Sequence, residues 1–465
     1  MDKNENETQY GRRDFLRLGA TAAAGVAAAG AGAGLVDVAR AADPRAQTPT
    51  GSLSVAIWGG PPDIQSLKDA VNRYQKQYSQ VHITLRYGAN ACGVSYADCK
   101  TLIAGGTMPD VFVPGIWNYN AMVDGGVLTD LGPYIARDKV SLSAFNPKVI
   151  SQMRALKDGK IYGLPMGFNV QSLYYNKDMF DKAKLPYPSA SGNYTWQNLR
   201  AMAKKLTLDA NGNTPASANF NPAKIKQWGF YTLAAVPIAP AYDPVLLAFG
   251  GSTMTFKDHQ RCNLEHPDSV RAWQFIQDLM WADHSTVTPQ VNQEQAGYLR
   301  WVAGHVAMQQ GSHEQTGLVN QQNPGLRYDM APLPREKAGP ATAIQMHIWS
   351  VYNRSKNKDL AWHFVNWVST VGSGTEMGLV PAYKDYALGP DFLQAPQQPA
   401  HLKQAQLDPT QWKLTSVPTA YNQKSDEIAG QDGFGPALTS IVTNKKRAAD
   451  ALRGISKKVD AIMRA

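Results

Sequence analysis

The feature that most constrains the fold is an alternation of short apolar runs with amphipathic stretches over residues 53–113. Residues 53–58 are β-rich, a helical pattern follows, and residues 81–87 alternate like a strand. A second helical stretch ends at Gly105-Gly106, and residues 110–113 form a short apolar run. Strands that alternate with helices in this way indicate a parallel sheet with crossover helices, so the expected class is α/β.

The carboxyl ends of the predicted strands carry residues suited to a ligand site, because ligands of open α/β sheets bind beyond these ends. Trp58 stands at the first end, directly before a Gly-Gly-Pro-Pro loop, and Trp117 and Asn118 follow the third strand. Asp63 precedes the first helical pattern and is expected to cap it. Two tryptophans are therefore predicted at one edge of the sheet.

Length and composition describe a soluble globular protein. The chain has 465 residues, of which 43% are hydrophobic and 18% are charged. This length suits two α/β lobes, and the composition excludes a disordered chain and a polytopic membrane protein. The net charge of +9 is spread along the chain without a basic block. Nucleic-acid binding is not expected, because it needs a clustered basic face.

The first forty residues resemble a twin-arginine (Tat) export signal. Arg12-Arg13 is followed by Phe15-Leu16, by an Ala- and Gly-rich stretch over residues 18–36, and by Ala39-Arg40-Ala41. We expect cleavage near Ala41, a linker over residues 42–51, and a product released into the periplasm. No cysteine that could carry a lipid anchor precedes Cys92.

The chain contains three cysteines. In an oxidising periplasm, Cys92 and Cys99 can form a disulfide that closes a short loop. Cys262 is then left over and is expected to be a buried small apolar residue. No Cys or His pair has the spacing of zinc ligands, so no metal site and no cofactor are expected. We interpret Asp209-x-Asn211-x-Asn213 as a turn, because Thr214 stands where a calcium loop requires Gly.

Residues 159–207, which begin GKIYGLPMGFNVQSLYYNK, resemble the hallmark segment of the family 1 extracellular solute-binding proteins. These proteins are the sugar-binding subunits of ABC importers. The resemblance extends over nearly all of residues 52–465. Further matches are residues 107–111, Phe249-Gly250-Gly251, residues 302–311 (a small-residue helix and a turn), residues 331–334, residues 377–382 and a C-terminal helix over residues 445–464.

The resemblance implies a two-lobe periplasmic-binding-protein fold, similar to type II. Each lobe would be a mostly parallel sheet flanked by helices, with the ligand in the cleft between the lobes. Mapped onto this chain, lobe one is residues 53–164 plus 333–374, and lobe two is residues 167–330 plus 383–465. The chain would cross between the lobes near residues 164–167, 330–334 and 376–383.

A neutral sugar needs aromatic rings for stacking and planar polar groups for paired hydrogen bonds. Residue type and the resemblance together give the candidate ligand-binding set. Its members are Trp58, Asp63, Trp117, Asn118, Phe168, Asn169, Tyr174, Tyr242, Asp243, Ser312, His313, Met346, His347, Tyr383 and Tyr421. Tyr242 and Asp243 are placed in a loop. Few of these side chains are charged, so the predicted site is neutral to weakly polar.

Some candidates depart from the family pattern or have two interpretations. Asn169 stands where family members often carry Glu, and Ser312-His313 stands where Pro-Trp usually follows Gly. Tyr174 and Tyr175 alternate along a strand, so at most one can face a ligand, and a core position for both is favoured. His313 and His347 are equally consistent with structural hydrogen bonding and with ligand binding.

The sequence favours a monomeric carbohydrate receptor that works with an ABC permease and is not an enzyme. A hydrolase would need paired carboxylates or a nucleophile with a base, and neither Gly-x-Ser-x-Gly nor His-Glu-x-x-His occurs. An alternative keeps the scaffold and changes the ligand to a polyamine, a metal chelate or a phosphodiester. A secreted hydrolase is the less favoured alternative.

Overall fold

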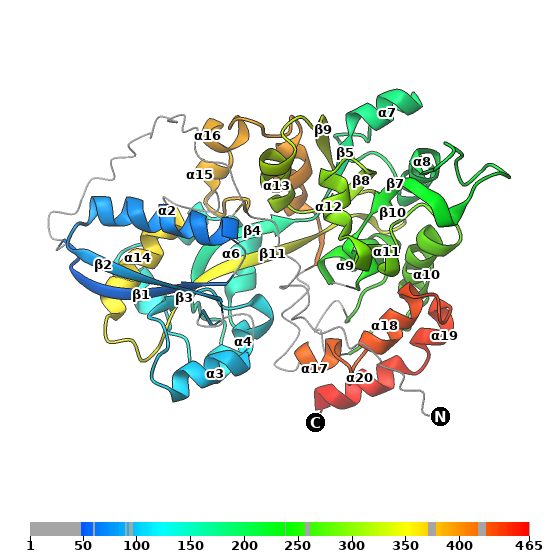
Figure 1. The fold of residues 1–465 in the computed structure, drawn as a ribbon. Helices are drawn as coiled ribbons and strands as arrows, with labels where there is room; N and C mark the ends of the chain where they lie inside the picture. The colour runs from blue at the N-terminus through cyan, green and yellow to red at the C-terminus, as the bar shows by residue number, and fades with distance from the viewer. Residues whose placement is uncertain are drawn as a thin grey trace, which may run out of the picture.

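A computed structural model describes residues 48–58, 61–88, 91–92, 96–237, 239–255, 261–370, 378–416 and 425–464. The predicted export signal and most of the predicted linker lie outside the described residues. The protein consists of two lobes, each built on one sheet with helices packed against it (Figure 1). The α/β class and the two-lobe fold predicted from the sequence are confirmed.

The secondary structure alternates along most of the chain. The strands are β1 (Gly51–Ile57), β2 (Val81–Tyr87), β3 (Val111–Phe112), β4 (Leu164–Val170), β5 (Ser172–Asn176), β6 (Leu208–Asp209), β7 (Ile225–Tyr231), β8 (Val306–Gly311), β9 (Tyr328–Pro332), β10 (Arg335–Glu336), β11 (Gly339–Val351) and β12 (Leu414–Ser416). The α-helices are α2 (Pro61–Gln77), α3 (Tyr96–Ala104), α4 (Ile116–Asp124), α5 (Gly132–Arg137), α6 (Pro147–Met153), α7 (Lys177–Ala183), α8 (Trp196–Leu206), α9 (Ala239–Phe249), α10 (Pro267–Trp281), α11 (Pro289–Glu294), α12 (Gly297–Val302), α13 (Glu314–Gln322), α14 (Lys358–Thr370), α15 (Lys384–Ala387), α16 (Pro390–Leu393), α17 (Ser425–Ala429), α18 (Gly435–Val442), α19 (Ala448–Leu452) and α20 (Ile455–Arg464). Short helical turns of other types are η2 (Leu142–Ala144), η3 (Pro222–Lys224), η4 (Leu233–Ala235), η6 (Lys403–Leu407) and η7 (Asp408–Gln411).

The first sheet has the strand order β10-β11-β3-β1-β2, and β4 and β12 also pair with β11. β1 is parallel to β2 and to β3, as the alternation over residues 53–113 predicts. β11 runs antiparallel to β3 and β4. In Figure 1, α2 lies on one side of this sheet, and α3 and α4 lie on the other.

The second sheet has the order β6-β7-β8-β5-β9. β5 is antiparallel to both β8 and β9, and only β7 and β8 pair in parallel. The prediction that each lobe contains a mostly parallel sheet is therefore wrong, because antiparallel pairs equal or outnumber parallel ones in both sheets. Residues 302–311, predicted as a helix and a turn, hold the end of α12 and the buried strand β8.

The chain passes between the lobes later than expected at all three points. β4 belongs to the first sheet and β5 to the second, so the first passage lies between Val170 and Ser172, not at residues 164–167. The second passage runs along β11 and not at residues 330–334, because Leu333 and Ala341 pack in the core of the second lobe, whereas β11 pairs with β4 from Ile344 onward. The third lies beyond residues 376–383, because Val380 pairs with Phe168 and Tyr383 with Phe145, both in the first lobe.

Local sequence explains several element boundaries. Thr195 is the N-cap of α8. Its hydroxyl accepts from the backbone N–H of Asn198, and the side-chain oxygen of Asn198 accepts from the backbone N–H of Thr195. α2 begins at Pro61, so Asp63 lies inside its first turn and is not its N-cap. The predicted C-terminal helix is divided into α19 and α20, because Gly454 adopts a φ of 77° between them.

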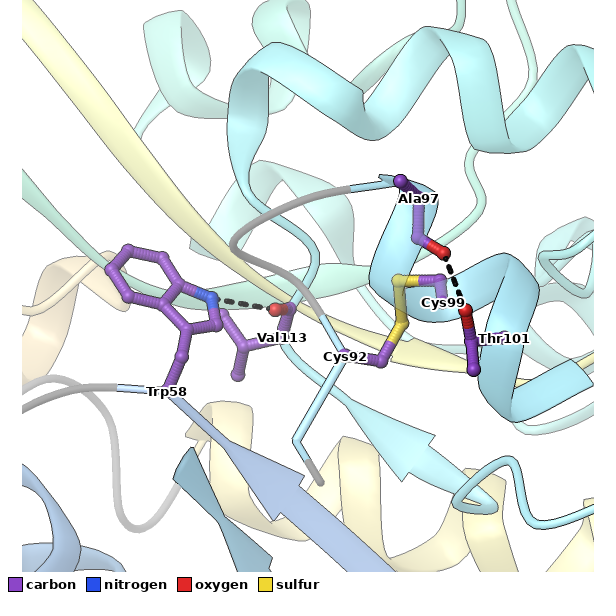
Figure 2. Close-up of a disulfide and its surroundings, with 6 residues drawn as sticks. All are labelled: Trp58, Cys92, Ala97, Cys99, Thr101 and Val113. Carbon is purple, nitrogen blue, oxygen red and sulfur yellow. Dashed lines mark hydrogen bonds between the residues drawn. A yellow bond between two sulfur atoms is a disulfide. The ribbon is translucent and has the colours of Figure 1, made fainter. Parts of the chain in front are cut away.

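A disulfide joins Cys92 to Cys99 in the first lobe (Figure 2). Cys99 is fully buried at the start of α3, and the bridge ties this helix to the segment that precedes it. Cys262 is a buried free thiol, and burial raises its pKa to about 11, so it is poorly reactive at neutral pH.

We expect reduction of this disulfide to lower the free energy of unfolding by about 2.5 kcal/mol, because the bridge restricts a short loop in the unfolded chain. Urea unfolding with and without reductant measures the effect. The double variant C92S/C99S should match the reduced protein and should not respond to reductant. A reductant effect of equal size in that variant would contradict the assignment.

None of the helices in the described part of the chain is both long and apolar enough to cross a bilayer.

Candidate ligand site between the two sheets

Trp58 lies immediately after β1, at the carboxyl end of that strand. Its indole Nε1 donates to the carbonyl oxygen of Val113, which follows β3, at 2.7 Å (Figure 2). The ring centroid lies 5.9 Å from that of His347 on β11. The side chain is only partly buried. The hydrogen bond thus fixes the orientation of an indole that keeps some exposed surface.

The pairing of β4 with β11 decides which candidates share a face. Asn169 lies opposite Gln345, and Gly167 lies opposite His347. Because side chains alternate along a strand, Asn169, Gln345 and His347 point to one side of the sheet. His347 is the residue that contacts Trp58. We call Trp58, His347, Gln345 and Asn169 the polar–aromatic face.

Phe168 and Met346 oppose each other on the other side of the same strand pair. Both are buried in the core of the first lobe, with exposed fractions of 0% and 2%. Sequence position alone could not separate Phe168 from Asn169 as the residue that faces a ligand. The strand register places Asn169, and not Phe168, on the polar–aromatic face.

Glu314 joins this face from the second lobe. It lies in the first turn of α13, and its Oε1 accepts a hydrogen bond of 2.6 Å from Nδ2 of Asn169. The amide oxygen of Asn169 is buried and has no hydrogen-bond partner within the described residues. Glu314 was not among the predicted residues. Its only signal in the sequence is its place directly after Ser312-His313, where the chain departs from the family pattern.

His347 is a neutral imidazole in this environment. Burial lowers its pKa to about 4, and its Nε2 is buried without a hydrogen-bond partner in the described part of the chain. A neutral ring nitrogen can donate to or accept from a hydroxyl, but it contributes no positive charge.

His313 lies at the start of α13 and is 5% exposed. Its Nδ1 is 2.9 Å from Oε1 of Gln406 on η6, and its ring centroid is 5.2 Å from that of Phe392. Burial lowers the pKa of His313 to about 4, although the Gln406 hydrogen bond opposes the shift. His313 therefore makes a buried structural hydrogen bond between α13 and η6.

Tyr174 and Tyr175 are both in the core, as favoured from the sequence. The hydroxyl of Tyr174 donates to the carbonyl oxygen of Ser312 at 2.8 Å, and its ring stacks on Tyr328. Ser312 is itself buried. These residues support the start of α13, and through it the position of Glu314.

Tyr242 and Asp243 lie in the core of the second lobe, away from the polar–aromatic face. The loop predicted here is the buried helix α9. The ring of Tyr242 packs on Trp273 with centroids 4.9 Å apart, and Asp243 accepts from Thr253 Oγ1 at 2.7 Å. Burial makes the helix favourable despite its prolines.

The structure describes the side chains of two of the remaining candidates, Asn118 and Tyr383. Asn118 is buried on α4, and the ring of Tyr383 packs against Phe145 at 5.5 Å. Trp117 lies on the same helix α4, but its side chain, like that of Asp63, is outside the described part of the structure. Tyr421 lies outside the described residues altogether.

The chemistry of the polar–aromatic face is that of a neutral, hydrogen-bonding surface. It offers an indole, two amides and a neutral imidazole, with one carboxylate from Glu314 at its border. None of these five residues is Lys or Arg. No cluster of three His, Cys, Asp or Glu side chains suited to a metal occurs within the described residues.

The segment with a calcium-like spacing is a turn, as interpreted from the sequence. The Asp209 carboxylate accepts hydrogen bonds from the backbone amides of Asn211, Asn213 and Asn221. Its oxygens therefore stabilise the loop directly.

Comparison with known proteins agrees with this architecture. One solved structure, an ABC substrate-binding protein from Listeria monocytogenes in complex with cycloalternan, is 21% identical, with a TM-score of 0.72 over 89% of this chain and 99% of that chain. Another, Mycobacterium tuberculosis UgpB in complex with glycerophosphocholine, is 16% identical, with a TM-score of 0.70 over 90% of this chain and 99% of that chain.

Sequence relatives are distant. A Brucella abortus protein described as a binding protein is 23% identical over 299 residues, which is 62% of this chain and 64% of the relative. The alignment thus spans less than two thirds of that relative's length.

Two sheets in two lobes, joined by repeated chain passages and bordering a polar–aromatic face, define a solute-binding protein. Residues 58–374 match the family described as bacterial extracellular solute-binding protein. The chain belongs to this family.

Proposed function

We propose that this protein is the exported receptor of an ABC importer and that it binds a neutral carbohydrate. The observation that carries the proposal is the pairing of a partly exposed indole with hydrogen-bonding groups that bear no charge, on one face near the junction of the lobes. A sugar ring presents flat C–H surface to an aromatic ring and hydroxyls to amides and imidazoles.

The charge of the face favours a carbohydrate over a phosphodiester, although one structural neighbour holds glycerophosphocholine. Phosphate recognition relies on Arg or Lys, and the polar–aromatic face has neither. His347 supplies no positive charge at neutral pH, because its pKa is lowered to about 4 by burial. A polyamine would need several carboxylates, whereas Glu314 is the only one that contacts this face in the described residues.

We further propose that the ligand is released unchanged. Glycoside hydrolysis requires two carboxyl groups placed about 5–9 Å apart on either side of the bond to be cleaved. Glu314 alone does not meet that requirement. Export by the Tat pathway, cleavage near Ala41 and action as a monomer are part of the same proposal and rest on the sequence.

A ligand panel tests the carbohydrate assignment. Monosaccharides, malto-oligosaccharides and cyclic oligosaccharides are compared with glycerophosphocholine and spermidine by thermal shift and tryptophan fluorescence. A bound ligand at 100 times its Kd should stabilise the protein by about 2.7 kcal/mol, and a sugar is expected to do so. Stabilisation by glycerophosphocholine or spermidine alone would overturn the assignment.

A further inference from the structure

Residues 445–464 are strongly cationic. They contain two acids, Asp450 and Asp460, and seven basic residues, for a net charge of +5 out of the +9 of the whole chain. The basic residues are Lys445, Lys446, Arg447, Arg453, Lys457, Lys458 and Arg464. The even spread of charge inferred from composition is therefore wrong for this segment.

The segment forms an outer layer of the second lobe, where α18, α19 and α20 lie at one edge of the molecule (Figure 1). Leu452, Ile455 and Val459 are buried in the core of that lobe. All seven basic side chains are exposed. The apolar residues thus hold the helices in place, and the cations remain in solvent.

Most of these cations have no acidic partner. Arg447 lies 3.6 Å from Asp278, and Arg453 lies 3.0 Å from Asp450. Asp460 instead accepts from the backbone amide of Cys262. The other five basic residues form no ion pair within the described part of the chain. They are Lys445, Lys446, Lys457, Lys458 and Arg464, which we call the basic face.

We infer that the basic face binds anionic phospholipid headgroups and holds the receptor at the membrane. The inference rests on the proposed export, which places the protein in the compartment where such a membrane surface is available. Each Lys or Arg near an anionic bilayer contributes about 1 kcal/mol of attraction within a Debye length. Five such residues are enough for reversible association.

The composition of the surface favours lipid over a protein partner. Protein interfaces are centred on aromatic and apolar anchors and are depleted in Lys, whereas four of the five residues of the basic face are Lys. The exposed large apolar residues Tyr87, Leu156, Tyr187 and Leu388 all lie outside this segment. Two acids lie nearby in the sequence, Glu427 on α17 and Asp432 between α17 and α18.

Sedimentation with vesicles tests the inference. The mature protein is mixed with vesicles of phosphatidylcholine alone or with about 30 mol% phosphatidylglycerol. We expect the protein to bind only to the anionic vesicles. We also expect this binding to be lost when salt is raised from about 50 mM to about 500 mM. The K457E/K458E variant should reduce the partition coefficient at least about 10-fold.

The matched control is K224E/K226E, which makes the same charge change at exposed lysines of η3 and β7 on another part of the same lobe. It should bind nearly as the parent does, and circular dichroism verifies the folding of both variants. Equal loss in the control would overturn the inference, since net charge would then explain binding. No binding to anionic vesicles would also overturn it and leave an acidic protein as the partner. Ligand binding is scored separately on the same samples, so failure of the sugar panel overturns only the proposed function.

Discussion

Replacing Trp58 with Ala is expected to raise the Kd for the bound sugar roughly 60-fold. A sugar stacked on one face of the indole covers about 100 Å² of apolar surface, worth about 2.5 kcal/mol. The substitution also removes the hydrogen bond to Val113 and the contact with His347. Isothermal titration with the sugar identified in the panel measures the change.

A matched control separates ligand binding from folding. Trp281 is also partly buried and also donates its indole Nε1 to a backbone carbonyl, that of Val442, but it packs against the core of the second lobe. Trp281→Ala should cost similar stability and leave the Kd within about 2-fold. An unchanged Kd in Trp58→Ala, or equal weakening in both variants, would remove Trp58 from the ligand site.

The first lobe could be predicted from the sequence because its signals are local. The alternation over residues 81–87 matches β2, and the glycines at 105 and 106 mark the end of α3. Each of these patterns is set by neighbours within a few residues. The parallel pairing of β1, β2 and β3 follows from the crossover helices between them.

The second sheet could not be predicted in the same way. β5 pairs with β8 and β9, which are more than 125 residues away along the chain, and the resulting antiparallel order has no local signature. α9 shows a related difficulty, since Pro240 and Pro244 favour a loop locally. Pro240 lies in the first turn, where its missing N–H is tolerated, and nearly every residue of the helix is buried. Tertiary burial outweighs the local preference.

The residues of the polar–aromatic face can be predicted from the sequence only in part, for the same reason. Trp58 could be identified because a strand end and a Gly-Gly-Pro-Pro loop locate it locally. The choice between Phe168 and Asn169 depends on the register with β11. Glu314 could not be found from the sequence, because its role depends on Asn169, which is 145 positions away and belongs to the other lobe.

Acidification is expected to destabilise the protein between about pH 6.5 and pH 4 through His313 and His347. Burial lowers the pKa of each to about 4, whereas an unfolded histidine titrates near 6.5. The unfolded chain therefore binds more protons in this window, so stability is fully present above about pH 6.5 and is lost as pH falls toward 4. Protonation of His313 lowers the free energy of unfolding by up to about 3 kcal/mol, and protonation of the partly exposed His347 lowers it by less.

Urea unfolding between pH 7.5 and pH 4.5 measures this loss, and histidine variants assign it. His313→Asn should be less stable than the parent at pH 7.5, because it loses the Gln406 contact, but the difference should shrink or reverse near pH 4.5. Exposed His82 provides the control, since His82→Asn should leave the pH dependence unchanged. Parallel curves for the parent and His313→Asn would show that this buried imidazole does not resist protonation. His347→Asn is compared with the parent in the same way. The comparison tests whether His347 is uncharged at neutral pH, and the proposed preference of the polar–aromatic face for a neutral ligand depends on this.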